Sequence, residues 1–138
     1  LNPKNGSTIW TMPSTGITGL TSHDGDLLAT LNDSRVQRID TFKRRIRWET
    51  QMPRKRGSAF IGVIAGKNLV ISFDQGALYW LDIATGQPLR KFDSGPGFSA
   101  PATFGGGQIF AIDNAARLFA FKTSQPKATQ IKVPLGSP

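Results

Sequence analysis

The chain repeats a similar pattern about every 40 residues, and this period restricts its fold more than any other feature. A ten-residue block that begins at Leu1 aligns without gaps with blocks that begin at Ile39 and Leu81, and a degraded copy begins at Phe121. A repeat of this length indicates one structural unit used several times. A polar turn residue stands at a fixed distance before each of the last three starts: Asn32, Asp74 and Asn114.

Each repeat contains short apolar runs that follow glycine turns and end at asparagine or aspartate. Such β-branched and aromatic runs, bounded by turn residues, predict β-strands. No segment keeps the periodicity of a helix over three turns. Every repeat therefore predicts strand, turn, strand, turn, strand, with clear runs at residues 27–31, 69–73 and 109–112.

Units of this length, each unable to bury both faces alone, are typical of a β-propeller, in which blade packs on blade around an axis. We therefore predict an all-β partial propeller of about three four-stranded antiparallel blades. A β-sandwich is the alternative, but it does not require the same turn at the same phase of each repeat. The expected propeller covers 1–124, with blade boundaries near 12–50, 55–92 and 96–124, and a C-terminal extension covers 125–138.

One hairpin turn recurs with a recognisable chemistry. The carboxylate of Asp82 is placed to accept hydrogen bonds from the turn backbone, and Gly86 supplies a position with positive φ. Trp10 and Trp48 hold equivalent places in the repeat, where an indole has the bulk to cover the end of such a hairpin. The expected structural signature of the repeat is Trp10, Trp48, Asp74, Gly76, Asp82 and Gly86.

The register of the repeat places residue 1 between the third and fourth strands of a blade. Closed propellers have roughly four to eight blades, and open blade edges expose unpaired backbone groups. We therefore expect a fragment of a longer protein, or pairing of the open blade edges with a second copy.

The net charge of +8 favours anionic partners, and basic residues gather in one stretch. The two clusters in it are expected on opposite rims of a blade, as two small patches. Three interpretations stay open: solvated turns, contact with an acidic partner or anionic headgroups, and contact with nucleic acid. The candidate partner-contact residues are Lys43, Arg44, Arg45, Arg54, Lys55 and Arg56.

The turn and strand residues of 74–86 resemble the PQQ-like repeat, with its Asp-x-Gly turn, Leu-Tyr strand and Asp-x-x-Thr-Gly turn. The order of pieces in 68–122, including a Gly-Phe-Ser-x-Pro element at 97–101, is similar to the closing blades of the BamB family, lipoproteins of the outer-membrane barrel-assembly machinery (the BAM complex). The sequence departs from the pattern where Lys43 and Arg44 replace Thr-Gly and where Arg90 replaces the tryptophan.

The resemblance implies a non-catalytic scaffold at the periplasmic face of the outer membrane of a Gram-negative bacterium. It implies an eight-bladed propeller that binds the periplasmic domains of the barrel-inserting subunit BamA, with no nucleic acid. Membrane attachment is expected only through an N-terminal lipid anchor outside this chain. In that family the main partner contacts lie on earlier blades, so none is transferred to these residues.

The sequence offers little catalytic chemistry. His23 is the single histidine and sits beside Asp24 in a turn, and no Gly-x-Ser-x-Gly motif accompanies it. With no cysteine, a Cys-ligated zinc site and a vicinal cysteine pair beside a quinone are excluded. We therefore expect no enzyme, no metal and no cofactor. The alternative is the C-terminal part of a quinoprotein (PQQ-dependent) dehydrogenase.

Overall fold

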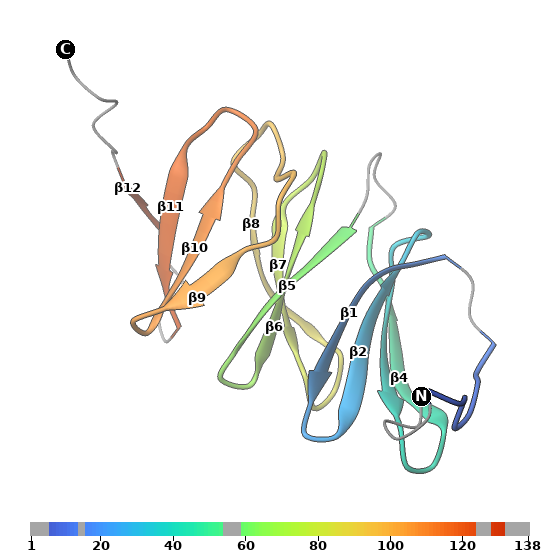
Figure 1. The fold of residues 1–138 in the computed structure, drawn as a ribbon. Helices are drawn as coiled ribbons and strands as arrows, with labels where there is room; N and C mark the ends of the chain where they lie inside the picture. Colours follow the sequence, from blue (N-terminus) through green and yellow to red (C-terminus); the bar gives the residue numbers. More distant parts are fainter. Residues whose placement is uncertain (1–5, 14–15, 54–58, 124–127, 132–138) are drawn as a thin grey trace.

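The computed structural model describes residues 6–13, 16–53, 59–123 and 128–131. These residues form twelve strands and no helix. The strands build three four-stranded antiparallel sheets, and within each sheet neighbouring strands are consecutive in the chain. Figure 1 shows the three sheets side by side in chain order, as blades of a partial propeller. The predicted all-β fold of four-stranded antiparallel blades is confirmed.

The blades have closely similar layouts. The first contains β1 (Ile17–His23), β2 (Asp26–Leu31), β3 (Arg35–Asp40) and β4 (Arg45–Gln51). The second contains β5 (Ala59–Ala65), β6 (Asn68–Phe73), β7 (Leu78–Asp82) and β8 (Pro88–Phe92). The third contains β9 (Thr103–Gly105), β10 (Gln108–Ile112), β11 (Leu118–Lys122) and β12 (Ala128–Ile131).

The third sheet extends further along the chain than the sequence indicates. Strand β12 lies inside 125–138, the stretch assigned above to a C-terminal extension, and pairs with β11 from Leu118↔Ile131 to Phe121↔Ala128. The four-residue strand Ala-Thr-Gln-Ile has a single large apolar residue and so lacks the pattern that marks the other strands. The third blade therefore takes its outermost strand from this stretch.

Two apolar cores lie between the blades. Successive side chains of a strand point to opposite faces, so Leu69 packs toward the first blade while Val70 packs toward the third. Both are fully buried because the second sheet is covered on both faces. Each such side chain contributes about 1.5–3 kcal/mol of transfer free energy. The largest buried residues of the second core include Trp80, Phe98 and Phe121.

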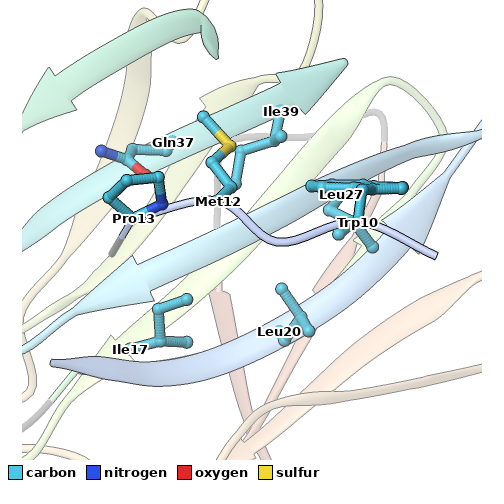
Figure 2. Close-up of a pocket in the computed structure, with 8 residues that line it drawn as sticks. All are labelled: Trp10, Met12, Pro13, Ile17, Leu20, Leu27, Gln37 and Ile39. Atoms are coloured by element: carbon cyan, nitrogen blue, oxygen red, sulfur yellow. The ribbon is translucent and has the colours of Figure 1, made fainter. Parts of the chain in front are cut away.

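The outer face of the first blade is partly covered by the N-terminal segment. Residues 6–13 form no strand and run across this face, where Met12 packs against Ala29, Leu31 and Ile39. Figure 2 shows Trp10, Met12 and Pro13 on this segment above β2 and β3. An apolar pocket remains between the segment and the sheet, lined by Trp10, Met12, Pro13, Ile17, Leu20, Leu27, Gln37 and Ile39.

Candidate functional site

The β3–β4 hairpin ends in a turn that is held by hydrogen bonds. The Oδ1 atom of Asp40 accepts bonds from the backbone N–H groups of Phe42 (3.0 Å) and Lys43 (2.9 Å). The hydroxyl of Thr41 donates to the carbonyl of Gly25 in the neighbouring β1–β2 turn. The backbone N–H of Lys43 lowers the pKa of Asp40, and this effect with that of nearby Arg47 outweighs burial, which acts to raise it. Asp40 is therefore a carboxylate that fixes the turn.

Basic residues around this turn fall into two groups. Arg38 and Arg47 direct their Nε atoms at the buried carboxylate of Asp26, at 2.7 and 2.6 Å, and Arg47 also reaches Asp40 at 3.0 Å. These two arginines serve an ion network inside the blade. The other group lies at the tip and is exposed, and within the described part of the chain none of its members forms an ion pair: Lys43, Arg44 and Arg45. The charge of Lys43 still helps to lower the pKa of Asp40.

A large apolar side chain stands among these cations. Phe42 is 92% exposed, although hydrogen bonds of Asp40 and Thr41 hold the turn to which it belongs. The charges of this stretch are prominent in the sequence, and Phe42 is not among the residues predicted to contact a partner. An available signal was the aromatic residue at a turn position where the equivalent repeat carries Ala84.

The β7–β8 hairpin repeats the turn with different side chains. The Oδ1 atom of Asp82 accepts a bond from the N–H of Ala84 at 2.9 Å, and Gly86 has a φ of 77°. Trp48 of the first blade packs against Gly86, where a Cβ would lie 2.5 Å from the indole. The indole N–H of Trp48 donates to the carbonyl of Ile83 at 2.8 Å. The hairpin of one blade is thus fastened to β4 of the blade before it.

The same contact recurs one repeat earlier with a substitution. Arg44 takes the place of Gly86 and has a φ of 59°, and its guanidinium carbon lies 5.8 Å from the centre of the Trp10 ring. Trp10 therefore contacts the positive-φ residue Arg44, as Trp48 contacts the positive-φ residue Gly86. A cation–π contact replaces the close approach that the glycine permits.

The departure at Arg90 has a structural counterpart. In the first blade, Arg38 on β3 pairs across the sheet with Trp48 on β4. In the second blade the types are exchanged, since Trp80 on β7 pairs with Arg90 on β8, and the Arg90 guanidinium lies 4.7 Å from the Trp80 ring centre. Both blades therefore have an arginine–tryptophan pair across their third and fourth strands, with the two residues exchanged between the strands.

The opposite ends of the blades carry the turns of Asp74 and Gly76. The N–H of Gly76 donates to the carbonyl of Phe73 at 3.1 Å, and the side-chain amide of Asn114 donates to the carbonyl of Asp74 at 2.8 Å. Gly97 has a φ of 95° and approaches Asp74 so closely that a Cβ would lie 2.1 Å from its carbonyl oxygen. The Gly-Phe-Ser-x-Pro element therefore links the second and third blades.

The second predicted basic cluster, Arg54, Lys55 and Arg56, lies outside the described residues. His23 contacts Asp24 at 3.3 Å in the β1–β2 turn. In the described ranges, no three metal-ligating side chains come together. None of the described residues belongs to a helix long and apolar enough to cross a membrane.

Comparison with known proteins places the fold. No protein-family model matches the chain, and no curated protein matches it by sequence. Among solved structures, BamB from Moraxella catarrhalis is similar over 86% of this chain and 36% of its own length, with 20% identity and a TM-score of 0.65.

Two further solved structures resemble this chain. The Cps50 (Swd1) β-propeller domain from Myceliophteria thermophila covers 91% of this chain and 40% of its own length, with 16% identity and a TM-score of 0.67. A quinohemoprotein alcohol dehydrogenase from Comamonas testosteroni is similar over 83% of this chain and 20% of its own length, with 15% identity and a TM-score of 0.67. The chain therefore spans two fifths or less of these structures. The likeness shows a β-propeller fold.

Proposed function

We propose that the chain is part of a non-catalytic protein-interaction scaffold of the Gram-negative envelope, serving outer-membrane β-barrel assembly at the periplasmic face. The observation that carries this proposal is the β3–β4 tip, where Lys43, Arg44 and Arg45 lie exposed on a preformed turn and form no ion pair in the described part of the chain. Further support comes from the residues of 68–122 that resemble the BamB family and from the likeness in fold to BamB.

A scaffold of this kind binds through loops that are ordered before the partner arrives. The hydrogen bonds of Asp40 and Thr41 hold the tip in one conformation, so little conformational entropy is lost on contact. The cations attract an anionic partner surface and raise its association rate. We propose acidic faces of the periplasmic domains of BamA as the protein partner. Arg54, Lys55 and Arg56 are proposed as a second patch.

A pull-down from envelope extracts tests the scaffold role with the full chain as bait. The wild-type chain should recover a barrel-assembly component at low salt. The Lys43→Glu, Arg45→Glu variant should recover much less, because two charges are reversed at the tip while Arg44 keeps its contact with Trp10.

The matched control is Lys91→Glu, Lys122→Glu, which makes the same charge change on exposed residues of the second and third blades. It should recover the partner as the wild type does. Failure of the wild-type chain to retain any barrel-assembly component would overturn the proposed function.

A second candidate is the C-terminal part of a quinoprotein dehydrogenase, which the Comamonas testosteroni enzyme favours as a structural neighbour. Titration of the chain with pyrroloquinoline quinone and calcium separates the two. A stoichiometric absorbance change would favour the dehydrogenase, and its absence would favour the scaffold.

A further inference from the structure

Phe42 differs from every other exposed apolar residue among those described. The other large apolar side chains with substantial exposure are 41–55% exposed and lie in strands or, for Ile9, in the N-terminal segment. Phe42 is 92% exposed and sits on a turn. It therefore projects from the molecule, and it makes little contribution to either apolar core.

The fold of the turn does not require this side chain or its neighbours. The equivalent turn of β7–β8 is built with Ala84, Thr85 and Gly86 around the same aspartate bond. At Arg44 the backbone has a φ of 59°, a conformation that favours glycine. The contact of Arg44 with Trp10 offsets its unfavourable φ, but the turn does not need Phe42 or Lys43, so the explanation of these two residues lies in what the tip contacts.

We infer that the β3–β4 tip inserts into the surface of an anionic phospholipid bilayer. Phe42 enters the interfacial layer, and Lys43, Arg44 and Arg45 contact the headgroup phosphates. An aromatic ring beside basic residues suits this boundary, because the ring lies at headgroup depth while the cations meet the negative surface potential. The inference rests on the anionic contact proposed above and replaces BamA by lipid as the partner of this tip. The loss of a barrel-assembly component in Lys43→Glu, Arg45→Glu is then expected only from an extract that still contains membrane fragments.

The shape and charge of this end of the blades favour a bilayer over an acidic protein. The tip is convex, and a protein partner would need an apolar pocket ringed by carboxylates, whereas a bilayer presents phosphates above an apolar layer everywhere. In Figure 1 the β1–β2, β3–β4 and β5–β6 turns all lie at the lower end, which brings exposed Lys67 to the same rim. Asp24 on the adjacent β1–β2 turn is an exposed carboxylate there, and it contacts His23.

Vesicle flotation with the full chain tests this inference without any protein partner. The chain should float with vesicles of phosphatidylcholine mixed with phosphatidylglycerol and stay behind with phosphatidylcholine alone. Phe42→Ser should weaken binding about tenfold, since partial burial of the ring is lost. Lys43→Gln, Arg45→Gln should weaken it by a similar factor or more, and added salt should weaken it further.

Matched controls keep the result specific to the tip. Ile112→Ser removes an exposed apolar side chain at the other end of the third blade, and Lys91→Gln removes an exposed cation toward the other end of the second; both should bind as the wild type does. Phe42→Trp should retain binding, with a blue-shifted emission that acyl-chain-brominated lipids quench. Thermal unfolding followed by circular dichroism checks that every variant is folded.

Two outcomes would overturn the inference: no binding of the wild-type chain to anionic vesicles, or binding unchanged in folded Phe42→Ser. If the tip variants lose a protein from envelope extracts while the wild type ignores vesicles, the tip binds an acidic protein and the lipid assignment fails. If vesicles bind and no barrel-assembly component is recovered, the scaffold role fails and the lipid contact stands.

Discussion

The β3–β4 and β7–β8 hairpins have the same turn design and opposite surface chemistry. Each turn is closed by an aspartate that accepts a backbone bond, and each has a residue of positive φ four positions later: Arg44 after Asp40 and Gly86 after Asp82. Between these fixed points the first hairpin carries Thr41, Phe42 and Lys43, and the second carries the uncharged residues Ile83, Ala84 and Thr85. Two positions therefore determine the turn, and the intervening residues are available for binding.

The β3–β4 turn has the less favourable residue at its positive-φ position, and its aspartate makes more bonds than that of the β7–β8 turn. Asp40 is 2% exposed, holds two backbone N–H groups and is paired with Arg47, whereas Asp82 is half-buried and holds one. Arg44 lacks the conformational freedom that Gly86 has. The added bonds of Asp40 offset this disadvantage and keep the tip ordered.

The largest effect is expected when the positive-φ position of the β7–β8 turn receives a residue with a Cβ, as the β3–β4 turn has at Arg44. Gly86→Ala should lower the free energy of unfolding by about 3 kcal/mol, because positive φ disfavours a Cβ and the added atom meets Trp48. Urea denaturation measures the loss. Gly66→Ala is the control, since its φ is 62° but nothing lies within 4 Å of the added Cβ; equal losses at both positions would reject the role of the Trp48 contact.

Replacing each turn aspartate by alanine compares how much Asp40 and Asp82 contribute to the free energy of unfolding. Asp40→Ala should cost about 2 kcal/mol, since two turn N–H groups lose their acceptor and Arg47 loses one of its two carboxylate partners. Asp82→Ala should cost about 1 kcal/mol, because a single side-chain bond in a partly exposed turn is lost. Chemical denaturation of both variants under one condition decides the order, and a larger loss for Asp82→Ala would contradict it.

Acid should weaken the β3–β4 turn through Asp40. The folded pKa of Asp40 is lowered, first by the N–H of Lys43, so its contribution to stability is present above the unfolded value of about 4. That contribution is lost as pH falls through the folded pKa. Urea midpoints measured down to pH 2 should therefore fall less steeply in Asp40→Ala than in the wild type. Identical slopes would show that Asp40 is not a source of the acid sensitivity.

The smallest effect is expected for Arg44→Gly, which makes the first turn resemble the second. Relief of the positive-φ backbone and loss of the cation–π contact with Trp10 are each worth about 0.5–1 kcal/mol and have opposite signs. The unfolding free energy should change by less than about 0.5 kcal/mol. A loss above 1 kcal/mol in denaturation would mean that the Trp10 contact outweighs the relief of the backbone and contradict the expected balance.

Local chemistry explains why the strands and the β7–β8 turn are predictable. The runs at 27–31, 69–73 and 109–112 fall within β2, β6 and β10, since glycine and aspartate delimit buried strands in the sequence itself. The short polar strand β12 has no such pattern. The ion pair of Arg47 with Asp26 could not be predicted either, because it depends on the register of the strands, which decides which cations lie near a carboxylate. The turn position of Phe42 in the repeat was a sequence signal, but its exposure needed the structure, since an aromatic residue is most often buried.

The carbonyl of Ile83 has a consequence for how such chains diverge. It accepts bonds from both the Trp48 indole and the Arg38 guanidinium of the preceding blade. A main-chain oxygen is present whatever residue occupies the position, so mutation alters the donors without deleting the acceptor. Docking of one blade on the next is therefore tolerant of sequence drift.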